Sequence, residues 1–200
     1  MKMDANSPVE AYREAGRRYL RTQDIEDWQE KDKRMRELKE TWEDCFSRLI
    51  ALAETRDSEI WMALGDAYSK GWGIDKNREK AAQWFKRAAD EGHVGAMVRL
   101  GMILQHPETP ESHGQAIEWY RRAAGEGDPS GMVHLGFAYR EGRGVAEDSA
   151  EAVRWFLRAV DAGNSHALVL AGRASSNRAS NRCACSSEPR QLVRLKATLC

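Results

Sequence analysis

The chain has 200 residues, of which 42% are hydrophobic and 31% charged, as in an ordinary protein of one or two globular domains. Its 31 basic and 31 acidic residues cancel, which argues against a protein that holds nucleic acid by bulk positive charge. It has no apolar run near the roughly 20 residues of a membrane span and no apolar secretory signal, so we expect a cytoplasmic protein. We expect neither membrane nor nucleic-acid partners. Only one cysteine lies before residue 183, which predicts that no disulfide framework holds the fold together.

The first 57 residues are predicted to form two helices that serve as an N-terminal helical cap. Ser7-Pro8-Val9-Glu10 is a strong helix start, with Ser7 as N-cap and Glu10 at the third position, and it predicts a helix over about 8–21. A second helix is predicted over about 24–55. Its apolar residues follow one another at steps of three and four, with Trp28 one heptad ahead of the others. This seam consists of Trp28, Met35, Leu38, Trp42, Cys45, Leu49 and Leu52.

The seam on 24–55 has two interpretations. Apolar residues at this spacing are typical of a helix that zips to a second copy, which would make the protein a homodimer. The same seam can equally pack on the chain's own first helix and first repeat. Phe46 and Ile50 widen the apolar face toward the C-terminal end of the helix, which favours this second, capping role.

From residue 58 onward one phrase recurs about every 35 residues. A Leu-Gly pair lies within each apolar stretch, and an aromatic pair with small residues behind it follows 19 or 20 residues after the leucine. The Leu-Gly pairs are Leu64-Gly65, Leu100-Gly101 and Leu135-Gly136, and the aromatic pairs are Trp84-Phe85, Trp119-Tyr120 and Trp155-Phe156. A period of this length is typical of stacked helical pairs. It predicts first helices over about 59–70, 94–105, 129–140 and from 165, and second helices over about 77–91, 112–126 and 148–162.

The repeated glycine is expected to be a packing device. Glycine inside a helix costs about 1 kcal/mol relative to alanine, so its recurrence at one register indicates that a second helix approaches closely there. The tryptophans stand 18 or 19 residues after the glycines. We expect each indole face to lie over a glycine backbone, which would make the tryptophans core residues and not a ligand site.

The predicted helix ends carry capping signals. Ser112 with Gln115, and Asp148 with Glu151, have capping-box spacing. Asp128-Pro129 is typical of a helix start with aspartate as N-cap. Glycines at the far ends of the second helices fit left-handed C-caps. These are Gly92, Gly127 and Gly163.

Glycine-rich loops join the two helices of the first and third units. Gly71-Trp72-Gly73-Ile74 and Gly142-Arg143-Gly144-Val145 are predicted to be turns whose aliphatic residue tucks back into the core. No Lys-Ser/Thr follows them, so they are not phosphate loops.

Taken together, these positions resemble the Sel-1-like repeat, a relative of the tetratricopeptide repeat. The resemblance covers about 58–172, as units 58–93, 94–128 and 129–164 and an incomplete unit 165–172. It implies an all-α fold, an α/α solenoid of antiparallel helix pairs, and a non-catalytic scaffold or adaptor role. Repeat two departs from the pattern because residues 105–110 replace the glycine loop. The incomplete unit departs because no second helix with tryptophan follows it.

The composition changes at about residue 173. Residues 172–200 hold six basic residues against one acid, and the small polar stretch that opens them predicts a disordered, flexible tail over 173–200 that does not belong to the repeat array. Cys183 and Cys185 could form half of a zinc site, with Cys200 as the remaining cysteine. The second half of such a site is missing, which favours exposed thiols.

No set of residues points to catalysis, to a cofactor or to a metal. The chain lacks G-x-S-x-G, S-x-x-K and H-E-x-x-H, and its five histidines are scattered over different units. The resemblance implies instead a protein or peptide partner bound on the inner face of the first helices. By analogy with tetratricopeptide registers, the inner-face residues are Met62, Asp66, Ser69, Val98, Met102, Gln105, Val133, Phe137 and Arg140.

Two alternatives stay open at this point. The inner-face residues could be buried by a tight superhelix or covered by the N-terminal helix. The protein could also be an enzyme or a regulatory subunit with a site between the N-terminal helices and the first repeat, and clustered acids or histidines in that cleft would indicate it.

Overall fold

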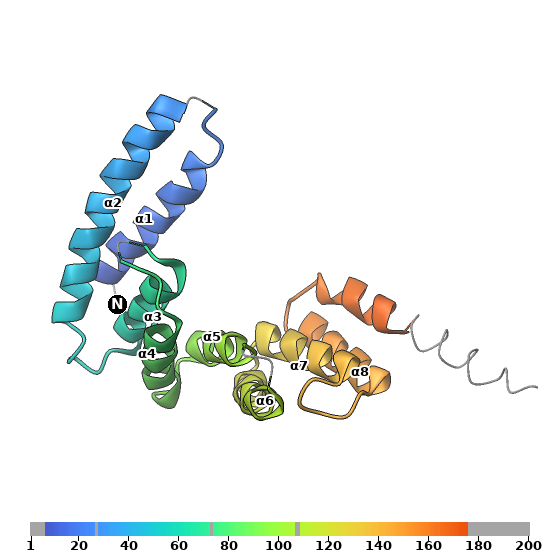
Figure 1. The fold of residues 1–200 in the computed structure, drawn as a ribbon. Coiled ribbons are helices and arrows are strands. Elements are labelled where there is room, and N and C mark those ends of the chain that lie inside the picture. The colour runs from blue at the N-terminus through green and yellow to red at the C-terminus, as the bar shows by residue number, and fades with distance from the viewer. Residues whose placement is uncertain (1–6, 27, 73, 107–108, 176–200) are drawn as a thin grey trace, which may run out of the picture. The chain divides into compact units, whose positions relative to one another are not determined.

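The computed structural model describes residues 7–26, 28–72, 74–106 and 109–175. They form two compact units, of which the first ends at Glu126 and the second begins at Gly127. The described residues are helical, without strands, and the predicted all-α class of repeated helix pairs is confirmed (Figure 1). None of these helices is long and apolar enough to cross a membrane.

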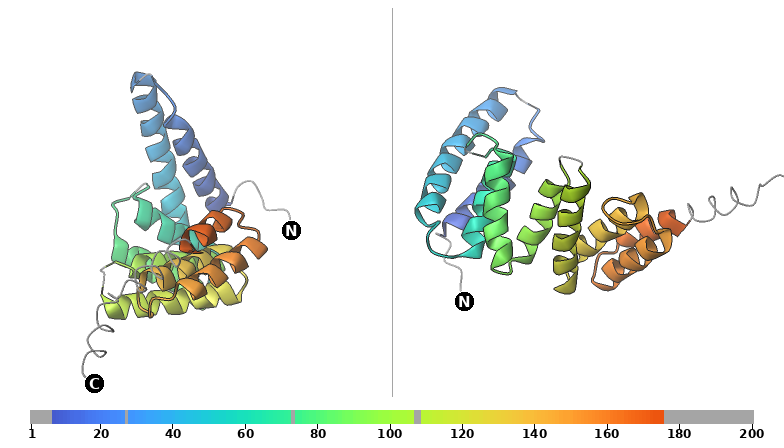
Figure 2. Two further views of the ribbon diagram at one scale, coloured as in Figure 1. Left: turned by 90° about the vertical axis from the view of Figure 1, so that its right-hand side faces the viewer. Right: turned by 60° about the horizontal axis from the view of Figure 1, so that its bottom comes forward.

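The first unit consists of three helix pairs. Its helices are α1 (Pro8–Thr22), α2 (Trp28–Ala51), α3 (Ser58–Lys70), α4 (Arg78–Asp90), α5 (Val94–Leu104) and α6 (Pro110–Gly125). Each odd-numbered helix packs on the helix that follows it, and α4 also packs on α5 (Figure 2). The second unit holds α7 (Pro129–Glu141), α8 (Ser149–Asp161) and a short helix over 167–175.

Each repeated glycine receives an aromatic ring, but the ring is not the one expected. A Cβ atom placed on Gly65, Gly101 or Gly136 would lie 2.5 Å from a ring of the facing helix. Those rings belong to the residue after each tryptophan, namely Phe85, Tyr120 and Phe156, which are at most 1% exposed. The expected indole contact is therefore wrong. Successive side chains on a helix point about 100° apart, so only one residue of the aromatic pair faces the glycine.

The tryptophans lie half-buried beside this core. Each of them is covered by the arginine three residues further along its helix, with the guanidinium carbon 4.6–4.7 Å from the ring centroid. These pairs are Trp84–Arg87, Trp119–Arg122 and Trp155–Arg158. The arrangement is a cation–π contact at the protein surface.

Most of the predicted caps are present. Asp148 accepts hydrogen bonds from the backbone of Ala150 and Glu151 at 2.8 and 3.0 Å, and Asp128 caps α7 through Gly131 N at 2.7 Å. The glycines after the second helices have φ values of 82–97°, which places them in the left-handed region. They are Gly92, Gly127 and Gly163.

Two caps and both ends of α2 differ from expectation. The capping box of α6 joins Thr109 and Ser112, because Pro110 at the first position favours an earlier start than Ser112. Ser7 makes no side-chain cap bond, and Glu10 pairs with Arg17 at 2.6 Å instead. Helix α2 spans Trp28–Ala51, so it begins later and ends earlier than the predicted range of about 24–55.

The seam on α2 is buried within this chain. Leu38, Trp42, Cys45 and Leu49 are at most 6% exposed and share one core with residues of α1 and α3. The intramolecular alternative is therefore what the structure shows for these four residues. Trp28, at the start of the seam, is 70% exposed.

The loop of the first repeat anchors α1 and α2. Gly71 has φ +75°, in the left-handed region. The Trp72 ring that follows it stacks on the Trp42 ring, with centroids 5.2 Å apart and planes within 7° of parallel. Trp72 also lies against Gly16, where a Cβ would approach its ring to 2.8 Å. The corresponding residue of the third repeat, Arg143, is exposed. The two loops share their glycine turns but not this docking function.

The incomplete fourth unit begins with the helix over 167–175. This helix continues past residue 173, where the tail was expected to start. The remainder of the predicted tail, 176–200, with its three cysteines, lies outside the described residues.

Candidate functional site

The inner-face residues of the first unit differ in how much they offer to a partner. Val98 is 7% exposed and belongs to the core, whereas Met102, one turn later on α5, is 41% exposed. Met62 and Asp66 on α3 are half-buried, Ser69 is exposed, and Gln105 directly after α5 is half-buried. Met102 is therefore the apolar side chain of this set that is most open to contact.

Asp66 lies between α3 and α5 with one oxygen left unsatisfied. Its Oδ2 atom is 3.3 Å from Lys70 Nζ, and its Oδ1 atom is 3.9 Å from Arg99 Nε. Oδ1 is buried and accepts no hydrogen bond from the described residues. A buried acceptor without a donor is costly, and a hydrogen bond to this oxygen would offset that cost.

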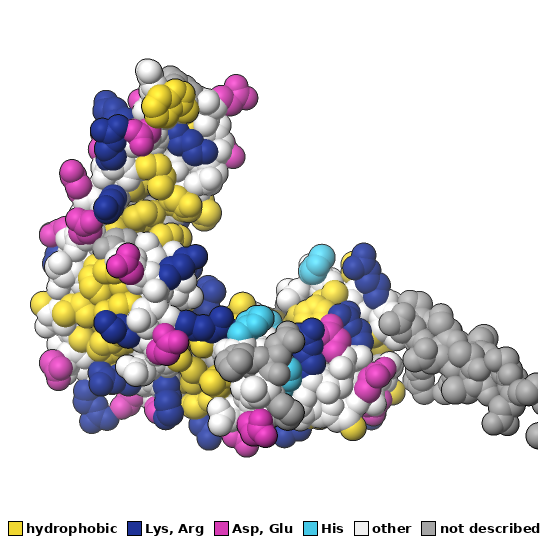
Figure 3. All heavy atoms as spheres, in the orientation of Figure 1, with side chains coloured by type: hydrophobic (Ala, Val, Ile, Leu, Met, Phe, Trp, Pro, Cys, Tyr) yellow, Lys and Arg dark blue, Asp and Glu magenta, His cyan; other side chains and the backbone are white. Residues whose placement is uncertain are grey.

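Helix α1 runs beside this face and leaves a cavity of about 350 Å³ between itself and α3, which we name the α1–α3 cavity. Hydrophobic side chains reach the surface between charged ones over α1 and α2 (Figure 3). The cavity is lined by Tyr12, Arg13, Gly16, Arg17, Leu20, Met62, Ala63, Asp66, Lys70 and Trp72. The N-terminal helix therefore flanks Met62 and Asp66 without filling the space beside them.

Tyr12 supplies a second unsatisfied polar atom to the α1–α3 cavity. Its side chain is 2% exposed, and its hydroxyl has no hydrogen-bond partner among the described residues. Burial, with smaller contributions from Asp66 and Cys45, raises the pKa of Tyr12 well above its usual range. The hydroxyl therefore stays protonated and can donate a hydrogen bond at any physiological pH.

The same cavity bears on the enzyme alternative. Its lining contains one carboxylate, Asp66, and no histidine, and the described residues contain no cluster of three acid, histidine or cysteine side chains placed to hold a metal ion. His93 lies outside the cavity lining and pairs with Glu59 at 3.3 Å, and Glu59 also pairs with Arg13. The clustered acids or histidines that would indicate an active site are not among the residues that line this cavity.

In the second unit the inner-face residues belong partly to a core. Phe137 packs edge-on against Phe156, with centroids 5.4 Å apart. The guanidinium carbon of Arg140 lies over the Phe137 ring, 4.7 Å from its centroid. Val133 packs against the same core. A substitution at Phe137 would therefore change packing as well as any contact surface.

His134, also on α7, is expected to make the second unit sensitive to acid. Burial lowers the pKa of His134 from the usual 6.5, and Asp128 acts in the opposite direction. The contribution of neutral His134 to the free energy of unfolding is present above the unfolded-state pKa and is lost as pH falls through the folded-state pKa. We expect the free energy of unfolding to fall as the pH drops below 6.5, by about 1.4 kcal/mol for each unit by which the pKa of His134 is lowered. The variant His134→Gln should remove this part.

Urea unfolding at a series of pH values measures the effect. The exposed His166, which lies in the same unit, gives the matched control His166→Gln. An acid response that is equal in both variants would contradict the assignment to His134.

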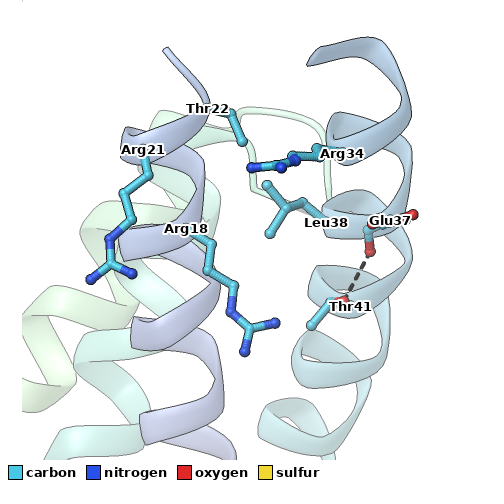
Figure 4. A pocket seen from close by; sticks show the side chains of 7 residues that line it. All are labelled: Arg18, Arg21, Thr22, Arg34, Glu37, Leu38 and Thr41. Carbon is cyan, nitrogen blue, oxygen red and sulfur yellow. Dashed lines mark hydrogen bonds between the residues drawn. The ribbon is translucent and has the colours of Figure 1, made fainter. Parts of the chain in front are cut away.

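Sequence reasoning missed a basic hollow between α1 and α2, because its residues are far apart in the chain. The hollow has a volume of about 240 Å³ and is lined by Arg18, Arg21, Thr22, Arg34, Glu37, Leu38 and Thr41. Arg18 and Arg34 reach into the gap between the helices, whereas Arg21 points away from it (Figure 4). Both inward arginines already pair with glutamates of their own helices, Glu14 at 3.5 Å and Glu30 at 2.6 Å. The hollow is therefore an ion-paired surface more than an anion site.

A second hollow that the sequence did not predict lies beside Trp119, the tryptophan of repeat two. It has a volume of about 370 Å³ and is lined by Ala82, Gln83, Lys86, Leu100, Leu104, Gln115, Glu118, Trp119 and Arg122. The recurrence of tryptophan at this position is the sequence signal that points to the hollow. The signal was missed because the indole was expected to cover the glycine. Trp119 thus lines an open depression together with residues of α4, α5 and α6.

The repeat pattern now agrees in sequence and in three-dimensional packing. The Sel1 repeat family matches residues 62–93, 94–128 and 129–164, just over half of the chain. The chain belongs to the Sel1 repeat family. Proteins of this family are in general protein-interaction scaffolds without enzymatic activity.

Solved structures support the same assignment. The chain is similar to a Sel1 repeat protein from Oxalobacter formigenes, with 28% identity and a TM-score of 0.57 over 66% of this chain and 55% of that one. It is similar to c5321, a protective antigen of uropathogenic Escherichia coli strains with an SLR fold, with 30% identity and a TM-score of 0.58 over 84% of this chain and 33% of that one. Cysteine rich protein B of Helicobacter pylori, at 20% identity and a TM-score of 0.50 over 66% of this chain and 96% of that one, shares the fold.

The chain spans about half and one third of the first two of these structures. A comparison with curated proteins found no significant match.

Proposed function

We propose that the protein is a non-catalytic scaffold that binds a peptide or helix of a protein partner on the inner face of α3 and α5. The α1–α3 cavity supports this proposal most directly. It combines an apolar wall, which includes Met62 and Trp72, with two buried oxygens that have no hydrogen-bond partner among the described residues, Tyr12 Oη and Asp66 Oδ1.

A bound peptide would satisfy all of these features together. An apolar side chain of the peptide would fill the cavity beside Met62. Once a movement of the covering side chains opens them, the two unsatisfied oxygens would pair with backbone groups of the peptide, since Asp66 accepts and Tyr12 donates. Met102, exposed and flexible, would adapt to the next side chain of the partner.

Peptides selected by phage display on the purified full chain test the proposal. We expect the selected peptides to lose at least about tenfold in affinity, measured by fluorescence anisotropy, for the variant Met102→Asp. This variant should stay folded because Met102 is 41% exposed. Leu157→Asp is the matched control, since Leu157 is 44% exposed on α8. Equal affinities for both variants would overturn the proposal.

A further inference from the structure

The three complete repeats follow one packing rule for their two helices. The first helix presents a bare glycine, and the second helix places an aromatic ring on it. Three residues after the ring comes an alanine that is 0% exposed, which lets the two helices approach closely. We name each such glycine a glycine socket. The ring and alanine pairs are Phe85 and Ala88, Tyr120 and Ala123, and Phe156 and Ala159.

The first helix of the incomplete fourth unit, over 167–175, has a glycine socket at the same position, but no aromatic ring covers it. Gly172 occupies the position of Gly65, Gly101 and Gly136, but a Cβ placed on it would meet no described atom within 4 Å. On the same face of the helix, Leu168 is 59% exposed. The corresponding residue of repeat two, Met97, also four positions before the glycine, is 6% exposed.

The opposite side of this helix is packed, so its orientation is fixed. Ala171 and Ala174 are at most 4% exposed and share a core with Ala152 and Phe156 of α8. Val169 on the remaining face is 52% exposed. The face that carries Gly172, Leu168 and Val169 is therefore uncovered at the place where a second helix lies in the other repeats.

The residues after Gly172 in this sequence do not supply the missing ring. Residues 173–200 contain no Phe, Tyr or Trp. A helix that fills the socket by the rule of the other repeats must therefore come from outside this stretch.

We propose that Leu168, Val169 and Gly172 form a docking site for an amphipathic helix of another protein. That helix presents an aromatic ring with alanine three residues later, as α4, α6 and α8 do, and so completes the fourth repeat in trans. The ring seats on Gly172, and apolar residues one turn away cover Leu168 and Val169. This site is separate from the inner face of α3 and α5.

The chain itself provides the probe. A fluorescent peptide with the sequence of residues 148–163, which spans α8, is titrated with the full chain and followed by anisotropy. We expect saturable binding that weakens at least about tenfold when the peptide carries Phe156→Ala, because the ring is the anchor of the contact. The variant Gly172→Leu of the full chain should weaken binding to a similar extent by filling the socket.

Matched variants keep the test specific. Gly114→Leu makes the same change at a helical glycine of α6 that also has no neighbour within 4 Å, and it should bind the peptide as wild type does. Met102→Asp should also leave this binding unchanged, which separates failure here from failure of the inner-face proposal. Circular dichroism checks that every variant is folded.

Three results would overturn the proposal. One is the absence of saturable binding, and another is equal affinity for wild type and Gly172→Leu. The third comes from sedimentation of the full chain. A dimer that Gly172→Leu disperses would show that a second copy, and not a foreign helix, occupies the site.

Discussion

Replacing Gly101 with alanine is expected to destabilise the first unit by about 1–2 kcal/mol, although alanine is the better helix former. The new Cβ would lie 2.5 Å from Tyr120 Cε1, and Tyr120 is 0% exposed, so its ring is enclosed and can move only if its neighbours in the core shift. Overpacking of this kind typically costs about 1–3 kcal/mol and sometimes more, and the contact of 2.5 Å favours the upper part of this range. Subtracting the gain of about 1 kcal/mol in helix propensity leaves the expected net loss. Equilibrium unfolding in urea, followed by circular dichroism, measures the change.

Gly114→Ala is the matched control for this prediction. Gly114 lies within α6, and a Cβ there would meet nothing within 4 Å. Only the gain in helix propensity from glycine to alanine remains, so the control should stabilise the protein by about 0.5–1 kcal/mol. The two substitutions are thus expected to have opposite signs. If Gly101→Ala also stabilised the protein, the assignment of Gly101 as a socket for Tyr120 would fail.

The glycine sockets show how far the sequence predicts this fold. The period and the mid-helix glycines were sufficient to predict helix pairs that approach closely at one register. They did not identify the ring, because two aromatic residues are adjacent in each second helix and only the helical rotation decides which one faces inward. The larger Trp119 lies half-buried under Arg122, while the smaller Tyr120 is enclosed.

The candidate site was harder to predict than the fold, for a related reason. The repeat register placed Met62, Asp66 and Met102 on one face of the first helices. It carried no information about α1, which is not a repeat and which forms the other wall of the α1–α3 cavity. Tyr12 and Asp66 are 54 positions apart in the sequence, so their proximity is a property of tertiary packing alone.

The position of α1 depends on Trp72, and Trp72→Ala is expected to destabilise the first unit by about 2–3 kcal/mol. The indole stacks on Trp42 and also contacts Tyr12 and Tyr19, with centroids 5.9 Å away in both cases. Truncation would remove these contacts and leave a void against Gly16. Large aromatic truncations in a core cost about 3–5 kcal/mol, and the partial exposure of Trp72 lowers the expected value.

The third repeat supplies the control for this prediction. Arg143 stands at the same loop position, is exposed, and pairs with Glu141 at 3.0 Å, so Arg143→Ala should change stability by no more than about 0.5 kcal/mol. Urea unfolding measures both variants, and the exciton signal of the stacked indoles in circular dichroism should vanish only with Trp72→Ala. Equal, small effects would mean that α1 is held without the loop. A large effect confined to Trp72 would mean that the first repeat uses its glycine loop to hold α1, and with it the wall of the α1–α3 cavity, in place.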